Sequence, residues 1–475
     1  LAGGGMACCG AAVEASYWAK KNGLKVTLVD KAAMERSGAV AMGLSANNQY
    51  VDLNSGNNTL KDYCDYVRND LMGITREDQV ANIARHVDST VHLFEKWGLP
   101  IWKDKEGNYV HEGRWQLMIN GESYKVIVAE AAKNALADAG GEYFERVFLT
   151  HPLMDGNKCV GAIGFSVREN KVYVFKAKAT LCAMGGAVHV FKPRSTGEGF
   201  GRSWYPPFNS GASAFFTLYA GAEMTCQEVR FIPVRFKDAY GPVGAWFLLF
   251  KSVATNAQGG NYMQLNAAEL EKWESYGKVK PCPANLRNWL MMLDVMEGKS
   301  PIYMQTAEAI QRIADESPDE KAAKRKLKEL EAEAWEDFLD MTISQAILWA
   351  ASNVEPEKMP SEIMACDPYF IGSHSGASGA WVSGPEDLQN DQTKDEYFWG
   401  YPQMTTVDGL FAAGDASGAS SHKFSSGSHA EGRIAAKAAI AYILDNNAAP
   451  NVDQAQIDEL SARIVKPLDL FEENK

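Results

Sequence analysis

Three consecutive glycines near the start of the chain, followed by a helix-like run, could hold the phosphates of a nucleotide. The stretch reads "LAGGGMACCGAAVEASYWAKK" from Leu1. In G-x-G-x-x-G turns the glycines let the backbone turn tightly and approach a pyrophosphate, while the following helix supplies N–H donors. Gly3 and Gly5 occupy the first two positions, whereas Cys8 occupies the third and Gly10 follows it. The pattern predicts a phosphate-binding turn, although a purely structural strand-to-helix turn can use the same glycines.

An acidic residue at the end of the next expected strand strengthens the nucleotide interpretation. The run "LKVTLVD" is short, rich in β-branched residues and ends at Asp30. An acid about 20 residues beyond such a turn can bind ribose hydroxyls. The two features together predict a dinucleotide site that uses Gly3, Gly5, Met6, Ala7, Asp30 and Lys31.

A second stretch, far along the chain, distinguishes between dinucleotides. Residues 405–418 read "TTVDGLFAAGDASG". They resemble the late motif of flavoproteins with two-dinucleotide folds, in which a strand delivers a glycine and an acid, here Gly414 and Asp415, to the ribityl chain. Its alternative is a buried strand and turn without a ligand. Paired with the opening turn, the motif predicts FAD as the cofactor.

Further glycine-rich and serine-rich segments are candidates for loops around the flavin. Gly185 and Gly186 lie in "AMGGAVHVF", and "STGEGFGR" follows. Ser428 lies in "SSGSHAEG", ahead of a helix expected from about residue 430 to 444. The N-terminus of that helix would stabilise negative charge on a reduced flavin ring.

The elements around these motifs alternate between helix and strand. Periodicity predicts helices within 60–100 and over 124–139, and strands in "KCVGAIGFSV", "KVYVFKAK" and "ATLCAMGG". The first strand of the opening βαβ unit is expected to be reduced to Leu1 and Ala2. The charged run "SPDEKAAKRKLKELEAEAWEDF" predicts a solvated helix.

Composition restricts the class of protein and its partners. The net charge of −13 provides no general basic surface for nucleic acid. The eight cysteines include no C-x2-C pair, which argues against an iron–sulfur or zinc site, and no metal site is expected. Scattered thiols indicate a reducing cytoplasm. No apolar run reaches the roughly 18 to 20 residues of a membrane span.

Several phrases in this order carry a family resemblance. They include "ERSGAVAMGLSANNQY", "GRWQLMINGESYK", "AMGGAVHVFKPRSTGEGFGRSWYP", "RFIPVRFKDAYGPVGAWF" and "AWVSGPED". The chain resembles the flavoprotein subunits of the fumarate reductase and succinate dehydrogenase superfamily. Over essentially its whole length it is most similar to the α subunits of dissimilatory adenylylsulfate (APS) reductases.

The resemblance implies the fold class and domain limits. The expected class is α/β (α+β), with a Rossmann-like FAD-binding domain interrupted by an inserted capping domain. The implied limits are 1–235 and 368–450 for the two parts of the FAD-binding domain, 236–367 for the capping domain, and 451–475 for the start of a truncated C-terminal helical region.

The resemblance also implies how FAD is held. Respiratory members of the superfamily attach FAD covalently through a histidine, and Ser37 stands at the corresponding place in "RSGAVA". FAD is therefore expected to bind non-covalently, with Ser37, Gly38 and Ala39 in contact with it. The chain departs from the family pattern at Ala7, Cys8 and Asn47, which is expected to adjust packing without abolishing binding.

The implied reaction is the reduction of APS to sulfite and AMP, or its reverse, through a sulfite adduct at flavin N5. Such chemistry needs a cation facing the sulfur oxyanion and a donor for the developing charge. The matching residues are Arg235 and His374 as catalytic candidates, Asn48 near N5, and Trp204 supporting the flavin. Their ordinary roles would be a surface arginine, a structural histidine, a turn asparagine and a core tryptophan.

Other interpretations stay open. A dicarboxylate oxidoreductase of the fumarate reductase, succinate dehydrogenase or L-aspartate oxidase type shares the scaffold, and an inactive FAD-binding fragment is a third hypothesis. Arg114 and Glu122 are undecided as site residues. Because the chain lacks cluster cysteines, the resemblance implies a small iron–sulfur β subunit with two 4Fe–4S clusters as electron carrier, beside APS, sulfite and AMP as ligands.

Overall fold

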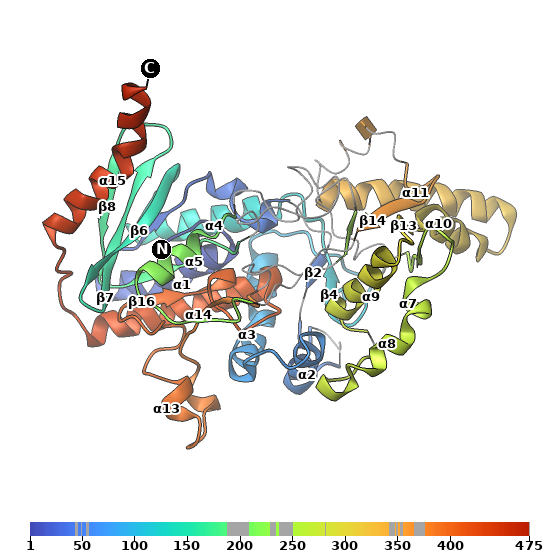
Figure 1. Ribbon diagram of the computed structural model, residues 1–475, viewed down its shortest axis with the longest axis horizontal. Coiled ribbons are helices and arrows are strands. Elements are labelled where there is room, and N and C mark those ends of the chain that lie inside the picture. The colour runs from blue at the N-terminus through green and yellow to red at the C-terminus, as the bar shows by residue number, and fades with distance from the viewer. Residues whose placement is uncertain are drawn as a thin grey trace.

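The computed structural model contains two lobes, which lie side by side in Figure 1. The first lobe holds both chain ends, and the second is built around α7 to α11. The structure describes residues 1–42, 46–48, 50–53, 57–187, 209–228, 234–236, 250–280, 282–341, 347, 350, 351, 355–364 and 376–474.

A parallel sheet forms the centre of the first lobe. The strand β1 (Thr27–Val29) pairs with β5 (Glu142–Phe144), and β9 (Thr180–Cys182) pairs with β16 (Leu410–Ala412). Ala2 bridges the two pairs, because it lies parallel to both Val29 and Cys182. Leu1 and Ala2 thus occupy the position that the sequence predicted for the first strand. The order β5, β1, Leu1–Ala2, β9, β16 is that of a Rossmann-like unit.

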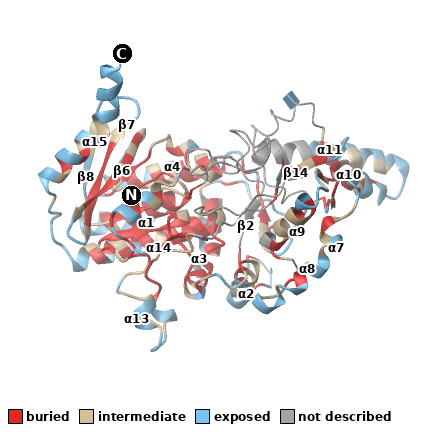
Figure 2. Ribbon diagram, viewed as in Figure 1, coloured by how far each residue is buried: buried red, intermediate tan, exposed pale blue. Residues whose placement is uncertain are grey.

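Two helices pack closely beside this sheet, and both are largely buried (Figure 2). They are α1 (Met6–Asn22) and α14 (Phe424–Asp445). A Cβ added at Gly10 would overlap the carbonyl oxygen of His429, and one at Gly432 would overlap that of Ala7. The helices therefore approach backbone to backbone, which only glycine permits at these positions.

The helix α14 begins earlier than the sequence indicated. It starts at Phe424, so the segment "SSGSHAEG" lies inside its first turns and not in front of them. The expected start near residue 430 is wrong. Serine and glycine in a row are typical of a loop, but here small residues are needed where α14 passes α1.

The remaining elements of the first lobe complete its layers. An antiparallel sheet joins β6 (Val147–Asp155), β7 (Lys158–Ser166) and β8 (Val172–Lys176), and β10 (Met224–Thr225) pairs with β15 (Gly379–Ala380). The helices are α2 (Leu60–Asp70), α3 (Glu77–Lys96), α4 (Tyr124–Asp138), α5 (Ala212–Tyr219), α13 (Lys394–Tyr397) and α15 (Gln454–Glu473). The short 3-10 turns are η1 (Met34–Arg36), η2 (Ala39–Met42), η4 (Glu386–Leu388) and η5 (Gly414–Ala416).

The second lobe has a hydrophobic core of its own, formed by residues between Val234 and Ile363. Its antiparallel sheet has the order β11 (Arg235–Phe236), β14 (Ser361–Met364), β13 (Ile302–Met304), β12 (Ala254–Thr255). Its helices are α7 (Tyr262–Leu265), α8 (Ala267–Glu271), α9 (Ala284–Met296), α10 (Thr306–Asp315) and α11 (Glu320–Met341), with the turn η3 (Glu274–Tyr276). A separate core supports an inserted domain, and 236–367 stay its proposed limits.

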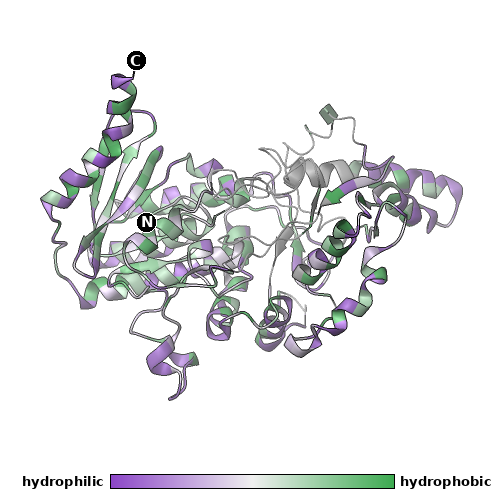
Figure 3. Cartoon of the chain, in the orientation of Figure 1, coloured by the Kyte–Doolittle hydropathy of each residue, from purple (hydrophilic) through white to green (hydrophobic). Residues whose placement is uncertain are grey.

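The charged helix and the lobe junction complete the architecture. The outer end of α11 is hydrophilic in Figure 3, as expected for a solvated charged helix. The small sheet of β2 (Ala46–Asn48), β4 (Gln116–Met118) and β3 (His111–Glu112) lies between the lobes in Figure 1.

Within the described residues, no helix combines the length and apolar character that crossing a membrane requires.

The helix crossing generates a stability prediction. Gly432→Ala places a methyl group against the carbonyl oxygen of Ala7, so we expect the apoprotein to lose about 1–3 kcal/mol of unfolding free energy. Urea unfolding followed by circular dichroism measures it. Gly5→Ala is the control, because its added Cβ would meet only the Cα of Gly38, at 3.8 Å. Equal urea midpoints for Gly432→Ala and the wild-type chain would contradict the close crossing.

Candidate FAD site

The opening glycines form a tight turn between the sheet and α1. Gly3 has φ of 114°, and a Cβ there would overlap the carbonyl oxygen of Ala183. Gly5 caps α1, whose first turn carries no acidic residue. The turn therefore presents a helix N-terminus with free space and no nearby carboxylate on the helix, which suits a phosphate group.

Asp30 lies directly beneath this turn. Its side chain is buried, with the residue 6% exposed. One carboxylate oxygen accepts the Gly4 N–H at 3.1 Å and the other accepts the Ala32 N–H at 3.2 Å. A carboxylate offers about four lone-pair positions, so these two bonds orient Asp30 while leaving it able to accept from ribose hydroxyls. The neighbouring Lys31 lies 5.2 Å from the ring centroid of Phe148, and burial lowers its pKa.

The segment Ser37 to Ala39 folds over the glycine turn. Gly38 has φ of 81°, and a Cβ there would lie 3.0 Å from the Cα of Gly5. Ser37 is buried and Ala39 begins η2. The structure thus brings this segment against the predicted pyrophosphate turn, although α1, β1 and η1 separate the two in the sequence.

The late motif reaches the same region from β16, the last strand in the order of the parallel sheet. Gly414 follows β16, and a Cβ there would lie 3.0 Å from the Cβ of Ala7. Gly414, Asp415 and Ala416 form η5 at the carboxyl end of the parallel strands. Ligands of open α/β sheets bind at that edge. Met6 and Ala7, predicted as cofactor residues, are buried in the first turn of α1 beside it.

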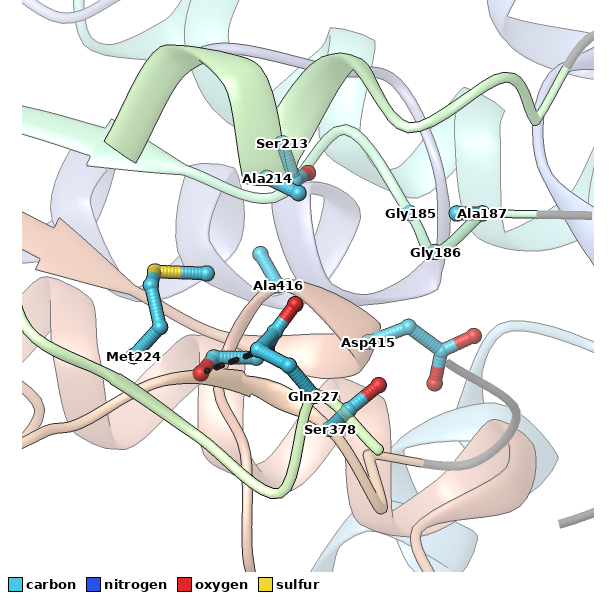
Figure 4. A pocket seen from close by; sticks show the side chains of 11 residues that line it. Gly185, Gly186, Ala187, Ser213, Ala214, Met224, Gln227, Ser378, Asp415 and Ala416 are labelled. Carbon is cyan, nitrogen blue, oxygen red and sulfur yellow. Dashed lines mark hydrogen bonds between the residues drawn. The ribbon is translucent and has the colours of Figure 1, made fainter. Parts of the chain in front are cut away.

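A small cavity, partly open to solvent, lies next to Asp415. Figure 4 shows the Asp415 side chain on the side of this cavity where Gly186 lies. The structure therefore brings residues of the segments "AMGGAVHVF" and "AAGD", which the sequence identified separately, to one cavity. The lining residues are Gly185, Gly186, Ala187, Ser213, Ala214, Met224, Gln227, Ser378, Gly379, Asp415 and Ala416.

Ser428 is more buried than expected for a residue in a loop. It is 9% exposed and belongs to the second turn of α14, because that helix starts at Phe424. The next residue, His429, packs edge-on against Phe94 and Trp97, with ring centroids 4.9 and 5.6 Å away. Burial lowers the pKa of His429 to about 3, so its imidazole is neutral at pH 7.

The catalytic candidates are placed only in part. Asn48 ends β2, opposite Gln116 of β4, and Arg235 begins β11, opposite Met364 of β14. The structure describes the backbone of both residues but not their side chains. His374 and Trp204 lie outside the described residues, as does "STGEGFGR". Their roles stay predictions.

Arg114 has a structural role in this structure. Its guanidinium donates to the Asn58 side chain at 2.7 Å and pairs with Asp62 at 3.0 Å. Asp62 also caps α2 through Thr59. Arg114 thus anchors the start of α2, and Glu122 has no described contact with the cavity.

A buried ion pair beneath the late motif was missed by the sequence reasoning. Lys423 and Glu431 are fully buried, and the Lys423 Nζ lies 2.8 Å from a Glu431 carboxylate oxygen. Burial raises the pKa of Glu431, and Lys423 opposes that rise. The two residues are two helical turns apart, beyond the i,i+4 spacing that signals a pair on a helix, so the sequence carried no signal for it.

These residues fit FAD. The opening glycine turn leaves room for a pyrophosphate, backbone N–H groups orient Asp30 at that turn, and Asp415 borders a cavity that Gly185 and Gly186 also line. Comparison with known families agrees, because the FAD-binding-domain family matches residues 1–249. The individual contacts to FAD stay predictions.

The proteins similar to this chain include several adenylylsulfate reductases. The adenylylsulfate reductase subunit alpha of Megalodesulfovibrio gigas is 49% identical over all of this chain and 74% of its own length. The solved adenylylsulfate reductase of Archaeoglobus fulgidus is 56% identical, with a TM-score of 0.91 over 97% of this chain and 72% of that one. A solved adenosine-5-phosphosulfate reductase in complex with sulfite as a covalent adduct matches equally, with the same four values.

More distant structures share only the fold. An E. coli quinol fumarate reductase is 16% identical, with a TM-score of 0.68 over 98% of this chain and 73% of that one. The predicted α/β class, with an FAD-binding domain of this superfamily, is thereby confirmed.

The opening glycine turn generates a prediction about FAD binding. The Cβ of Gly5→Ala has no neighbour within 4 Å among the described residues except the Cα of Gly38, so it points into the space left for the pyrophosphate. We expect FAD affinity to fall about tenfold or more, the factor that corresponds to about 1.4 kcal/mol of overpacking. Quenching of FAD fluorescence by the apoprotein measures the affinity. An unchanged dissociation constant would remove Gly5 from the site.

Proposed function

The chain belongs to the FAD-binding family of adenylylsulfate reductase alpha subunits, and from this we propose that it catalyses FAD-dependent reduction of APS to sulfite and AMP, or the reverse. The observation that carries the proposal is 49% and 56% identity to adenylylsulfate reductases along almost the whole chain. Dicarboxylate enzymes share the scaffold at only 16% identity, which leaves that alternative with the fold alone.

The chemistry requires an electron carrier and local positive charge. Bound FAD supplies two-electron transfer to or from the sulfur atom. The chain has a net charge of −13, so an anionic substrate such as APS needs a cation of its own at the site. The protein must also exclude water, because a fixed charge stabilises an oxyanion far better in a dry site.

We assign these roles to the predicted catalytic residues. Arg235 would bind the sulfo or phosphate group, His374 would assist it electrostatically, and Asn48 would lie near the reacting flavin atom. The placement of β2 between the lobes, and of β11 at the start of the second lobe, supports a substrate site at the lobe junction (Figure 1). Trp204, which lies outside the described residues, would support the flavin.

The electrons must enter or leave through a partner. An alpha subunit acts with at least one further subunit. We propose that this partner is a small iron–sulfur β subunit with two 4Fe–4S clusters. Among the described residues, no group of three histidine, cysteine or acidic side chains is arranged to hold a metal. A cytoplasmic location fits the many free thiols.

A sulfite titration tests the proposed function. We expect sulfite to bleach the visible absorbance of the FAD-loaded protein near neutral pH, because a sulfur oxyanion that reaches the flavin removes its oxidised chromophore. AMP with ferricyanide as electron acceptor should then permit turnover. The absence of bleaching in flavin-loaded protein would contradict the proposal. Reduction of fumarate would favour a dicarboxylate enzyme, and a folded protein that binds no FAD would favour an inactive fragment.

Arg235→Ala tests the assignment of the cation. We expect sulfite oxidation to slow by about 10² to 10³, the effect of removing one donor to a developing oxyanion. FAD affinity should stay at the wild-type value, since the proposed role concerns the substrate. Arg235→Lys serves as the matched control, because it keeps the charge but loses the planar fork of the guanidinium. Wild-type kinetics in Arg235→Ala would exclude Arg235 from the site.

A further inference from the structure

The polar atoms around Gly414 are bound by two buried charges. The Lys423 Nζ donates to the carbonyl oxygens of Gly414 at 2.6 Å and Ser417 at 2.9 Å, and to the Ser417 hydroxyl at 2.6 Å. Glu431 accepts the Gly414 N–H at 2.6 Å and the Ser417 hydroxyl at 3.0 Å. Both backbone groups of Gly414 are thus held from the protein side.

This arrangement fixes the turn from which the next residue emerges. Gly414 is held by the ion pair on its inner side, and Asp415 lines the cavity on the side where Gly186 lies (Figure 4). Gly414 has φ of 65°, a conformation that glycine adopts at little cost. The turn therefore has its geometry set by Lys423 and Glu431.

The loop between η5 and α14 is held from outside as well. The carbonyl oxygen of Ala419 accepts the Arg76 N–H at 2.7 Å and the Thr75 hydroxyl at 3.2 Å. His422 bonds to the Asp70 carboxylate at 2.6 Å. The segment that connects α2 to α3 thus restrains this loop from outside. The Lys423–Glu431 ion pair restrains the two ends of the loop.

Two apolar side chains would be the less costly choice at the positions of Lys423 and Glu431. A lysine at the N-terminus of a helix opposes the helix dipole, and burial of two charges costs more than apolar residues of similar volume. Lys423 also needs space that only glycine leaves, because a Cβ at Gly376 would overlap its side chain. Such a costly arrangement indicates a role other than stability.

We propose that Lys423 and Glu431 are positioning residues for the cofactor, holding the Gly414–Ser417 turn so that Asp415 and the backbone beside it meet FAD. The inference rests on the proposed FAD site but on no step of the sulfur chemistry. It predicts that the pair contributes to FAD affinity and contributes little or nothing to the stability of the apoprotein.

The decisive variant replaces both charges at once. Lys423→Met combined with Glu431→Gln leaves no unpaired charge and keeps an amide that can accept the Gly414 N–H and donate to its carbonyl oxygen, so the apoprotein should unfold near the wild-type temperature. We expect its FAD dissociation constant to rise about tenfold or more, because the turn loses its charged hydrogen bonds. Fluorescence quenching by FAD gives the constant, and calorimetry gives the unfolding temperatures with and without FAD. A wild-type dissociation constant would overturn the proposal.

Single variants separate positioning from general destabilisation. Glu431→Gln leaves Lys423 buried without its counter-charge, so it should lower both stability and FAD affinity. The matched control is Asp294→Asn in the second lobe, where Asp294 is also fully buried and accepts from Asn256 at 2.7 Å and Asn266 at 2.8 Å. The control should lose stability and keep its FAD affinity. If it loses FAD affinity equally, the effect is one of stability and the proposal fails. Because FAD binding is read directly, an absence of sulfite chemistry would not alter the result.

Discussion

The site depends on the close crossing of α1 and α14. At the first turn of α1, Ala7 touches both Gly432 on α14 and Gly414 in the late motif. Protein interiors are packed too tightly to absorb an added side chain without movement. The predicted phosphate-binding turn and the turn that carries Asp415 lie next to each other because the backbones meet here. The small residues at this crossing therefore determine whether the two distant segments form a single site.

Charge is handled differently at the two turns. The glycine turn relies on backbone N–H groups and the dipole of α1, with Asp30 held by two backbone donors beneath it. The late turn relies on a buried ion pair whose members bond to the backbone of Gly414. Both arrangements give a buried charge hydrogen-bonding partners and fix the backbone at the predicted cofactor site.

In the proposed site, the two lobes divide cofactor binding from substrate chemistry. The described residues that fit FAD lie in the first lobe, whereas Arg235 begins the sheet of the second. A substrate held between them would be enclosed on one side by the flavin and on the other by the second core. The family relationship gives this division a purpose, because an adenylylsulfate has an adenosyl part to be gripped and a sulfur group to be reached by the flavin.

The sequence alone determined the cofactor class, because glycines and an acid after a strand act through local backbone geometry. It determined the family because its characteristic phrases carry the resemblance. It did not determine where α14 begins, since serine and glycine are typical of loops until a neighbouring helix requires small residues. Nor did it reveal Lys423 and Glu431, because two charges at that spacing become partners only when the turn of Gly414 folds between them. Tertiary structure decided these points, since burial and close approach arise only when distant segments meet.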